Sequence, residues 1–588
     1  MAPTADLREV IFINHPNRVF PAIATVLAFL ALSPTPSFVP LTVLVATVLV
    51  QTRVVVPRPH APRVIFGTVA GVSLASTLSH LIPSIHALSS TASSLFSLWL
   101  ISSLSSAVAF LAVIISDRLS LRLNNPATKL TLFPTFWATI WQFISHTSPV
   151  GHLVTWSPVT GIASYEWMRP YFGAWGINWL VGAWAIVIAE VVGAWFIGPG
   201  DESEPPGPLI PSLVSNGEPQ PQPRRPTSSP GPLRTLLLTT ALFALTIPSF
   251  LLTTPTLPWS SSSTPLPVGC ILPHPPLPGD SSTALDRFIA ESKHHNGARI
   301  LLWPEGALRF ETISQRQDAI DRVRNEIKGP LVGVTFIEPV PPGAEWEHSR
   351  DGKWRNGLVL VGPDGPVAEY YKRNLVPIAE SYALTESKND PEIYEYELHA
   401  PNKNKKWTPV PPYERTIPLT AAICLDFASP TIFTPLDSRP ALILAPAQTW
   451  HHDVSRAMWE QARARAEEAG SFVLFCDGGA QGSSGVAGHG IREPIQFGSG
   501  SWTRTIGVEW PFNQRRTLYM WGGETLPVGI VWLLVGGGWA IEVLVLRGTG
   551  GIRGSAIHFS RLREVLGRAR AYLRRPTPVS GEEQPLLI

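Results

Sequence analysis

Long apolar segments with almost no charge fill the first half of the chain, and they constrain its fold more than any other feature. The apolar pattern predicts helices at residues 19–32, 36–50, 64–82, 95–116, 130–145, 177–197, 233–252 and 526–546. A membrane-spanning helix needs about 20 apolar residues, so the first, second and fifth segments are short for this purpose. Only 15% of the 588 residues are charged, against roughly 25% in typical soluble proteins. The pattern predicts a polytopic α-helical membrane domain, and the net charge of +2 gives no indication of a nucleic-acid partner.

The basic residues between these segments predict an orientation. They occur in three of the connections: Arg53, Arg58 and Arg63; Arg118, Arg122 and Lys129; and Arg224, Arg225 and Arg234. The alternate connections 33–37 and 83–94 contain no Lys or Arg. Because basic loops stay on the cytoplasmic side, this alternation predicts seven passes from a cytoplasmic amino terminus. The segment after residue 252 then lies outside the cytosol, and the eighth helix returns the chain to a cytoplasmic carboxyl terminus.

Composition divides the chain further. Six helices form a membrane domain at 1–199, and Pro/Ser-rich linkers at 200–232 and 253–267 flank the seventh helix at 233–252. Residues 268–525 form a soluble block, residues 526–547 the eighth helix, and residues 548–588 a basic cytoplasmic tail. The tail is either an amphipathic helix on an anionic leaflet or a solvated segment. The aromatic loop 156–175 is predicted on the side of the soluble block, where it either helps to admit lipid or forms an interfacial belt.

The soluble block alternates apolar strands with amphipathic helices. Predicted strands include "VGCILP", "ARILLWPEG", "LVGVTFI", "TIPLTAAICLD", "PALILAPA" and "SFVLFCDGG", with a hairpin around the Pro-Asp-Gly turn of "GLVLVGPDGPVAEYYKR". Predicted helices are "LDRFIAESKHHN", "DAIDRVRNEIKG" and "VSRAMWEQARARAEEAG". This order predicts α/β layering.

Three polar residues follow apolar strands and are candidates for catalysis. Glu305 follows a buried strand, where low polarity raises a carboxyl pKa and suits it to general-base work; the alternative is an ordinary loop acid. Lys372 ends a hairpin strand and can stabilise an oxyanion, with Glu380 nearby to orient it; the alternative is a solvated cation. Cys424, with Asp426 two positions later, is a candidate nucleophile, and the alternative is a buried structural cysteine.

The other two cysteines, Cys270 and Cys476, are interpreted as core strand residues. Three cysteines cannot all pair with one another, so at least one stays free or bonds to another chain.

Glu, Lys and Cys in this order, in "LLWPEG", "YYKRNLVPIAE" and "AAICLDFASP", resemble the nitrilase (carbon–nitrogen hydrolase) superfamily. With seven helices before the soluble block and one after it, the chain is similar to the apolipoprotein N-acyltransferase branch. The resemblance covers most of the chain in layout and residues 268–490 in motif detail. It implies an α-β-β-α sandwich beside the membrane helices.

The resemblance also implies roles and partners. Glu305 would be the general base, Lys372 would stabilise the tetrahedral intermediate, and Cys424 would be the nucleophile. The backbone amide of Leu425 would donate to the oxyanion, and Glu380 would support the site. Trp450 is the one residue that this chain keeps of the branch's Asn-Asp-Ala-Trp motif. The branch moves an acyl chain from a phospholipid to an amine of a lipoprotein through a thioester, with no cofactor and no metal.

The chain also departs from that branch. Ala447, Gln448 and Thr449 replace the first three residues of the Asn-Asp-Ala-Trp motif, and Asp477 stands where the branch has Asn. These changes put the acceptor in doubt more than the nucleophile. Arg465 and Glu468 are predicted to pair helices, and His451 and His452 lack the partners at ligand spacing that a metal site needs.

Two alternatives to the acyltransferase stay open. One is a membrane-anchored amidase or hydrolase that releases the acyl group to water. The other is a non-catalytic scaffold.

Overall fold

The computed structural model describes residues 9–85, 87–88, 90–123, 125–197, 232–251, 262–278, 281–341, 354–399 and 414–549. All eight predicted apolar helices are present within these residues. They are α1 (Pro16–Ala31), α2 (Phe38–Val55), α3 (Ala61–Ser79), α5 (Thr91–Ser120), α6 (Pro126–Thr147), α7 (Arg169–Ile197), α8 (Pro232–Ala244) with α9 (Ile247–Leu251), and α14 (Thr525–Thr549). The predicted linker up to residue 231 and the basic tail from residue 550 lie outside the described residues. Residues up to Leu533 form one compact unit.

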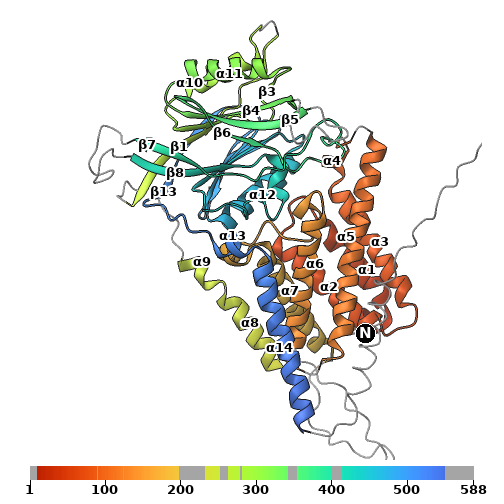
Figure 1. Cartoon of the computed structure of the whole chain (residues 1–588). Coiled ribbons are helices and arrows are strands. Elements are labelled where there is room, and N and C mark those ends of the chain that lie inside the picture. The colour runs from red at the N-terminus through yellow and green to blue at the C-terminus, as the bar shows by residue number, and fades with distance from the viewer. Residues whose placement is uncertain are drawn as a thin grey trace, which may run out of the picture. The chain divides into compact units, whose positions relative to one another are not determined.

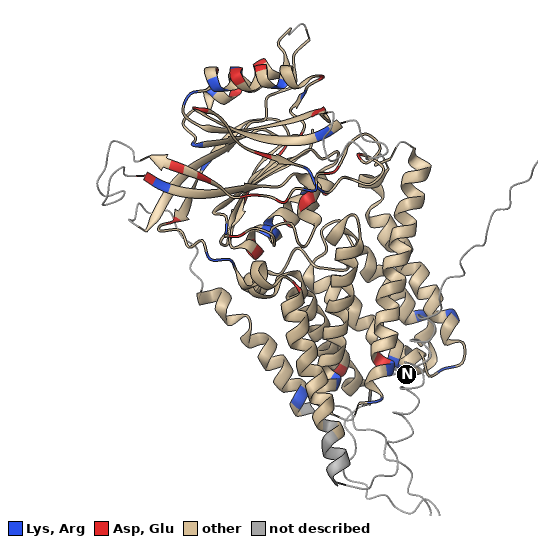
Figure 2. Ribbon diagram, viewed as in Figure 1, with Lys and Arg blue, Asp and Glu red and all other residues tan. Residues whose placement is uncertain are grey.

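Five helices in the described part of the chain are long and apolar enough to cross a membrane. They are Phe38–Val55, Ala61–Ser79, Thr91–Ser120, Ala163–Phe196 and Leu233–Leu251. The helix α1 has 16 residues, and the apolar part of α14, Thr525–Ile541, is also shorter than a full span. Figure 2 shows these helices almost free of charge along their middles, with Lys and Arg near their ends. These lengths and compositions are those of a multi-pass membrane protein, and the predicted orientation stays a prediction.

The helix α7 is sharply kinked at Gly173, where φ is 58° and ψ is −151°. Glycine adopts this left-handed region without the steric cost that a β-carbon brings. A β-carbon at Gly173 would also collide with the ring of Tyr519, which lies in the short helix α13 (Leu518–Gly522). The glycine therefore lets α7 bend around the tyrosine.

The soluble block folds into two sheets. The first has the order β13-β1-β2-β4-β5-β6, with β3 beside β4, and the second has the order β12-β11-β10-β9-β8-β7. The first sheet contains β1 (Ser263–Cys270), β2 (Ile300–Leu302), β3 (Leu308–Arg309), β4 (Leu331–Pro339), β5 (Trp354–Gly362), β6 (Gly365–Tyr371) and β13 (Trp502–Glu509). The second contains β7 (Tyr394–His399), β8 (Glu414–Ala421), β9 (Leu442–Ala447), β10 (Phe472–Asp477), β11 (Ser483–Gly488) and β12 (Ile491–Phe497). Both sheets mix parallel and antiparallel pairs.

Helices cover the outer face of each sheet (Figure 1). The helices α10 (Ala284–His294) and α11 (Ile313–Glu326) pack against alternate residues of the first sheet, such as Val359 and Val361. The helix α12 (His452–Ala469) covers the second sheet, where the rings of Trp459 and Phe475 lie 5.8 Å apart. The residues in between, such as Leu358 and Leu360, face the other sheet, because side chains alternate along a strand. This arrangement confirms the expected α-β-β-α sandwich.

A disulfide joins the two sheets between Cys270 in β1 and Cys476 in β10. Both cysteines are core strand residues, as predicted, and their pairing leaves Cys424 as the free thiol. The sequence left open which cysteine stays free.

The strand β1 begins inside the stretch 253–267 that we predicted as a linker, and that boundary is wrong at its carboxyl end. Residues Ser263–Cys270 pair with β13, but only Val268–Cys270 also pair with β2. The carbonyl of Pro267 accepts a hydrogen bond from the backbone of Arg299, just before β2, so the nitrogen of Pro267 faces the same side. The nitrogen of Pro265, two residues earlier, faces this side as well, and β2 does not extend that far. Proline is tolerated at such an unpaired edge because it has no N–H to donate.

Two tryptophans of the predicted aromatic loop 156–175 are packed inside the helical part, and its second half is helical from Ala163 onward. The side chains of Trp156 and Trp175 are buried, and the ring of Trp156 stacks on that of Trp141 at 6.0 Å. These two tryptophans fill the helical core, so they do not form the interfacial belt that was one of the two alternatives. The other alternative, that the loop helps to admit lipid, stays a prediction.

Candidate active site

Glu305, Lys372 and Cys424 meet where three strands end. Glu305 lies three residues after β2, Lys372 directly follows β6, and Cys424 begins the 3₁₀ turn Cys424–Ala428 after β8. The ammonium of Lys372 donates to Oε1 of Glu305 at 2.7 Å, and the Cys424 thiol lies within hydrogen-bonding reach of the same carboxylate. The three side chains are buried, with Cys424 7% exposed. The predicted constellation is therefore assembled in one buried site.

The backbone of Cys424 is unusual, because its φ is +48°. A non-glycine residue in this region is uncommon and marks stored strain that is often functional. The turn is held by Asp426, which accepts from the backbone of Ile423 at 2.9 Å and from the hydroxyl of Tyr370 at 2.7 Å. The same carboxylate accepts from the backbone of Asn374 at 2.7 Å. Asp426 therefore ties the turn that begins at Cys424 to the chain on both sides of Lys372.

Burial and charge set the protonation of the three groups. Burial raises the pKa of the Glu305 carboxyl, while the attraction of Lys372 opposes that rise. Burial, followed by repulsion from Glu305, raises the pKa of the Cys424 thiol well above its usual value. Burial alone would lower the pKa of Lys372, but Glu305, Cys424 and Glu380 together raise it well above its usual value. These shifts favour a neutral Cys424 thiol and a charged Lys372 ammonium at rest, with the Glu305 carboxyl group between them. This is the arrangement that a general base beside a nucleophile requires.

Glu380 holds the far side of the lysine. Its Oε1 accepts from Nζ of Lys372 at 2.8 Å, and its Oε2 accepts from the backbone of Val376 at 2.8 Å. The lysine ammonium is therefore held between the carboxylates of Glu305 and Glu380. This contact agrees with the expectation that Glu380 orients Lys372.

Two further groups that the sequence did not indicate bind Glu305. Nδ2 of Asn356 donates to Oε1 at 2.7 Å, and the backbone N–H of Gln448 donates to Oε2 at 3.0 Å. Asn356 lies in β5, and its carbonyl accepts from the backbone of Lys372 at 2.9 Å. The β5–β6 hairpin register therefore brings Asn356 to Glu305, and only this register, counted back from the Pro-Asp-Gly turn at the other end of the hairpin, could have indicated it.

The other two predicted supporting residues differ in their positions. Leu425 follows Cys424 and lines a cavity of about 80 Å³ together with Asn374, and its oxyanion role stays a prediction. The supporting role of Trp450 also stays a prediction, but its side chain makes a different contact. Its side chain is 49% exposed, and its indole donates to the carbonyl of Pro83 at 2.9 Å. Pro83 belongs to the short helix α4 (Leu81–Ser84), so Trp450 links the loop after β9 to the helical part.

Other residues that the sequence singled out make structural contacts around the loop after β9 and on α12. The buried carboxylate of Asp477 accepts from the backbone and hydroxyl of Thr449 at 3.0 and 2.7 Å, which fixes the loop that carries Gln448. His451 caps α12 by accepting from the backbone of Asp453 at 3.1 Å. Arg465 pairs with Glu468 on α12 at 2.7 Å, and Glu468 also pairs with Arg169 of α7 at 3.3 Å, as the predicted helix pairing requires.

Comparison with known proteins gives structural similarity only. No family model matches the chain, and no curated protein matches it in sequence. One similar solved structure is the amidase NitN from Neterenkonia sp. AN1, with 16% identity, 46% of this chain and 100% of that chain covered, and a TM-score of 0.30. Another is Nit3 from Saccharomyces cerevisiae, a member of branch 10 of the nitrilase superfamily, with 14% identity, 43% of this chain and 93% of that chain covered, and a TM-score of 0.32. A third is a carbon–nitrogen hydrolase from Helicobacter pylori G27, with 12% identity, 46% of this chain and 94% of that chain covered, and a TM-score of 0.29. The roles of the site residues rest on the geometry described above.

Proposed function

We propose that the chain is a membrane-bound acyltransferase, which moves a fatty acyl chain from a phospholipid to an amine of a lipoprotein-like acceptor through a thioester on Cys424. The observation that supports it is the buried Glu305–Lys372–Cys424 site in a chain whose described part contains five long apolar helices. A donor that resides in a bilayer is reached most directly by an enzyme anchored there.

The reaction has two steps. Glu305 accepts the thiol proton as the sulfur of Cys424 attacks the ester carbonyl of the phospholipid, and the oxyanion that forms lies beside the Lys372 ammonium. The lysophospholipid alkoxide leaves with the proton from Glu305, so that the acyl group is held as a thioester. An uncharged amine then attacks the thioester and loses a proton to Glu305, and the amide leaves as the thiol reforms. No electrons are exchanged with a cofactor in either step.

We propose an orientation in the membrane as part of the same function. Both termini lie in the cytosol, and the sandwich lies on the non-cytosolic side. The basic residues of alternate connections support this. The Cys270–Cys476 disulfide also supports it, because disulfides persist in oxidising compartments and are rare in the cytosol.

Intact-protein mass spectrometry tests the proposal. The detergent-purified full chain is incubated with phospholipid and no acceptor, beside Cys424→Ser. We expect a fatty-acyl adduct on the wild type alone, released by hydroxylamine, with the variant still folded. Free fatty acid without an adduct would favour the hydrolase instead, and neither product would remove the acyl-transfer proposal.

A further inference from the structure

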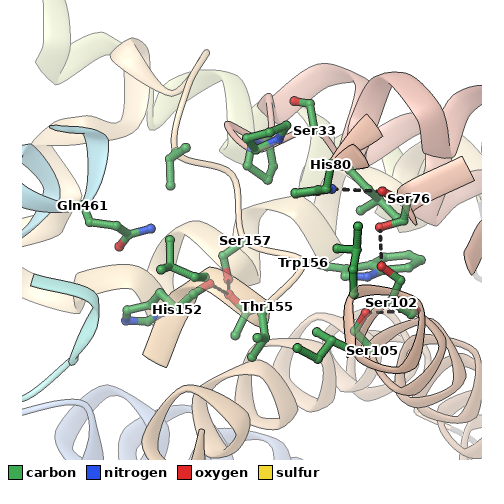
Figure 3. A pocket seen from close by; sticks show the side chains of 18 residues that line it. Ser33, Ser76, His80, Ser102, Ser105, His152, Thr155, Trp156, Ser157 and Gln461 are labelled. Carbon is green, nitrogen blue, oxygen red and sulfur yellow. Dashed lines mark hydrogen bonds between the residues drawn. The ribbon is translucent and has the colours of Figure 1, made fainter. Parts of the chain in front are cut away.

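A cavity of about 200 Å³ lies within the helical part and against α12. Its wall is formed by the chain after α1, by α3 and α5, by the stretch 152–159 and by Gln461 of α12. Figure 3 shows Ser76, His80, Ser102 and Ser105 at one end of this cavity and His152 and Gln461 at the other. None of the three proposed catalytic residues lines it, so it is separate from the site described above.

His152 is the polar group that makes this cavity unusual. Its side chain is buried, with 5% of the residue exposed, and neither ring nitrogen has a hydrogen-bond partner among the described residues. A neutral imidazole offers one donor and one acceptor, and leaving both unpaired in a buried site is costly. Burial, followed by the charges of Arg465 and Arg169, lowers the pKa of His152 well below its usual value, so the ring is neutral. A bound ligand that hydrogen-bonds to the His152 ring would explain why its two nitrogens have no protein partner.

The opposite end of the cavity is also polar and uncharged. Nδ1 of His80 lies 2.9 Å from the carbonyl oxygen of Ser76, so this nitrogen donates and Nε2 is left as an acceptor. The hydroxyls of Ser102 and Ser105 lie beside it. The described lining contains no Lys, Arg, Asp or Glu, and its remaining surface is largely apolar, from residues such as Ile101 and Trp156. This lining suits ester or hydroxyl oxygens joined to hydrocarbon, and it offers no counter-charge to a phosphate or carboxylate.

The size limits the ligand. A cavity of about 150 Å³ can hold a benzene molecule, so about 200 Å³ holds a group only slightly larger. A glycerol ester with its first methylenes has this size, and the rest of a lipid would extend among the apolar helices.

The cavity also lies close to the turn that begins at the proposed nucleophile, because one of its lining segments packs against that turn. His152 belongs to the 3₁₀ turn Gly151–Val154, and Gly151 in that turn packs against the carbonyl of Ala428 so closely that a β-carbon would collide with it. Ala428 ends the turn that begins at Cys424.

We infer that this cavity binds the glycerol-ester region of a lipid, with His152 and His80 as the groups that recognise its oxygens. The inference concerns lipid binding by the helical part and does not require acyl transfer. The glycerol ester can belong to a neutral diacylglycerol or to a phospholipid, and competition separates these sources.

The test is photolabelling of the full-length protein in detergent micelles, with a diacylglycerol that carries a diazirine on an acyl carbon near the ester. We expect labelled peptides from residues 152–159 and from the part of α5 that contains Ser105. Ser105→Phe fills the cavity and should reduce this labelling about fivefold or more. The control, Leu104→Phe, alters the adjacent residue of the same helix, which is 59% exposed, and should change labelling less than about twofold.

Two further arms complete the design. If unlabelled phosphatidylglycerol competes as well as dioleoylglycerol, the site accepts the ester of a phospholipid; if only dioleoylglycerol competes, it selects the neutral lipid. His152→Leu should reduce labelling without lowering the melting temperature of the lipid-free protein, because it removes two unpaired polar atoms. Cys424→Ser should label as the wild type does, which separates this inference from the catalytic proposal.

The inference is overturned if labelling does not respond to Ser105→Phe, or if it falls only on outward residues such as Leu104. A lower melting temperature of His152→Leu with full labelling would make the histidine a structural residue and would also overturn its assigned role.

Discussion

Several buried hydroxyls of the helices and the buried polar groups of the candidate site differ in how far along the chain their partners lie. In the helices, hydroxyls such as those of Thr42 and Thr52 donate to the carbonyl four residues earlier, at 2.7 and 2.8 Å. In the sandwich, Lys372 bonds to Glu305, which is 67 positions away, and Tyr370 bonds to Asp426, 56 positions away. The first pattern is satisfied locally by any helix, whereas the second exists only when the whole fold has formed. Buried charge held at long sequence range therefore occurs at the candidate site and, between Glu468 and Arg169, at the contact of the two parts.

The largest effect should come from Lys372→Met, which breaks that long-range pairing. It removes the charge beside the proposed oxyanion, so thioester formation should fall about 10²–10³-fold. It also leaves Glu305 buried without its cation, and breaking such a pair costs about 3–5 kcal/mol of unfolding free energy. Adduct formation by mass spectrometry and denaturant unfolding in detergent measure the two effects.

The matched control in the helical part is Thr42→Val. It removes one buried hydroxyl whose acceptor carbonyl already belongs to the helix, so we expect a loss of about 1 kcal/mol or less. Equal losses for the two variants would contradict the contrast between the two parts.

The disulfide is a second long-range link of the sandwich, joining positions 206 apart. Replacing both Cys270 and Cys476 by serine should lower the unfolding free energy by about 2–5 kcal/mol. In the denatured, unreduced wild type, alkylation should modify one thiol per chain, which peptide mapping should assign to Cys424. Three alkylated thiols in protein purified from its native membrane would contradict both the pairing and the proposed non-cytosolic location.

A smaller effect is expected where the two parts meet, at Glu468 between Arg465 and Arg169. Burial raises the pKa of Glu468 to about 7 from its usual value near 4.5, although both arginines oppose this. Glu468 then binds a proton more tightly in the folded protein than in the unfolded chain, so its contribution to stability is fully present below about pH 4.5 and is lost as the pH rises to about 7. The decline amounts to about 3 kcal/mol, at 1.36 kcal/mol for each unit of pKa.

Glu468→Gln cannot titrate, so its melting temperature should change less than that of the wild type between pH 5 and 8. The same pH dependence in both proteins would show that other groups are responsible.

The sequence predicted those parts of the fold whose signal is local. The strands β2, β9 and β10 are nearly continuous apolar runs, and β8 ends in one, so these strands could be predicted. Glu305 and Cys424 lie three residues after β2 and β8, and Lys372 directly follows β6, so the candidate residues could be predicted from the strand ends. The strand β11, "SSGVAG", was missed because serine and glycine give little strand signal, and its neighbours on both sides supply the pairing instead. Asn356 was missed for a related reason: only the β5–β6 register places it opposite Lys372. The cavity around His152 depends on the packing of distant helices, which no local pattern reports.

The smallest effect should come from Trp450→Phe. The sequence predicted that Trp450 supports the site, whereas in the structure its indole contacts Pro83 of the helical part. Phenylalanine keeps the ring but loses the indole hydrogen bond to Pro83, at a cost of about 1 kcal/mol or less because the side chain is half exposed. The rate of thioester formation should change less than about twofold, since Glu305 receives its backbone hydrogen bond from Gln448, two positions earlier. A tenfold slower rate at unchanged stability would restore Trp450 to the active site, and the loop after β9 would then belong functionally to both parts of the molecule.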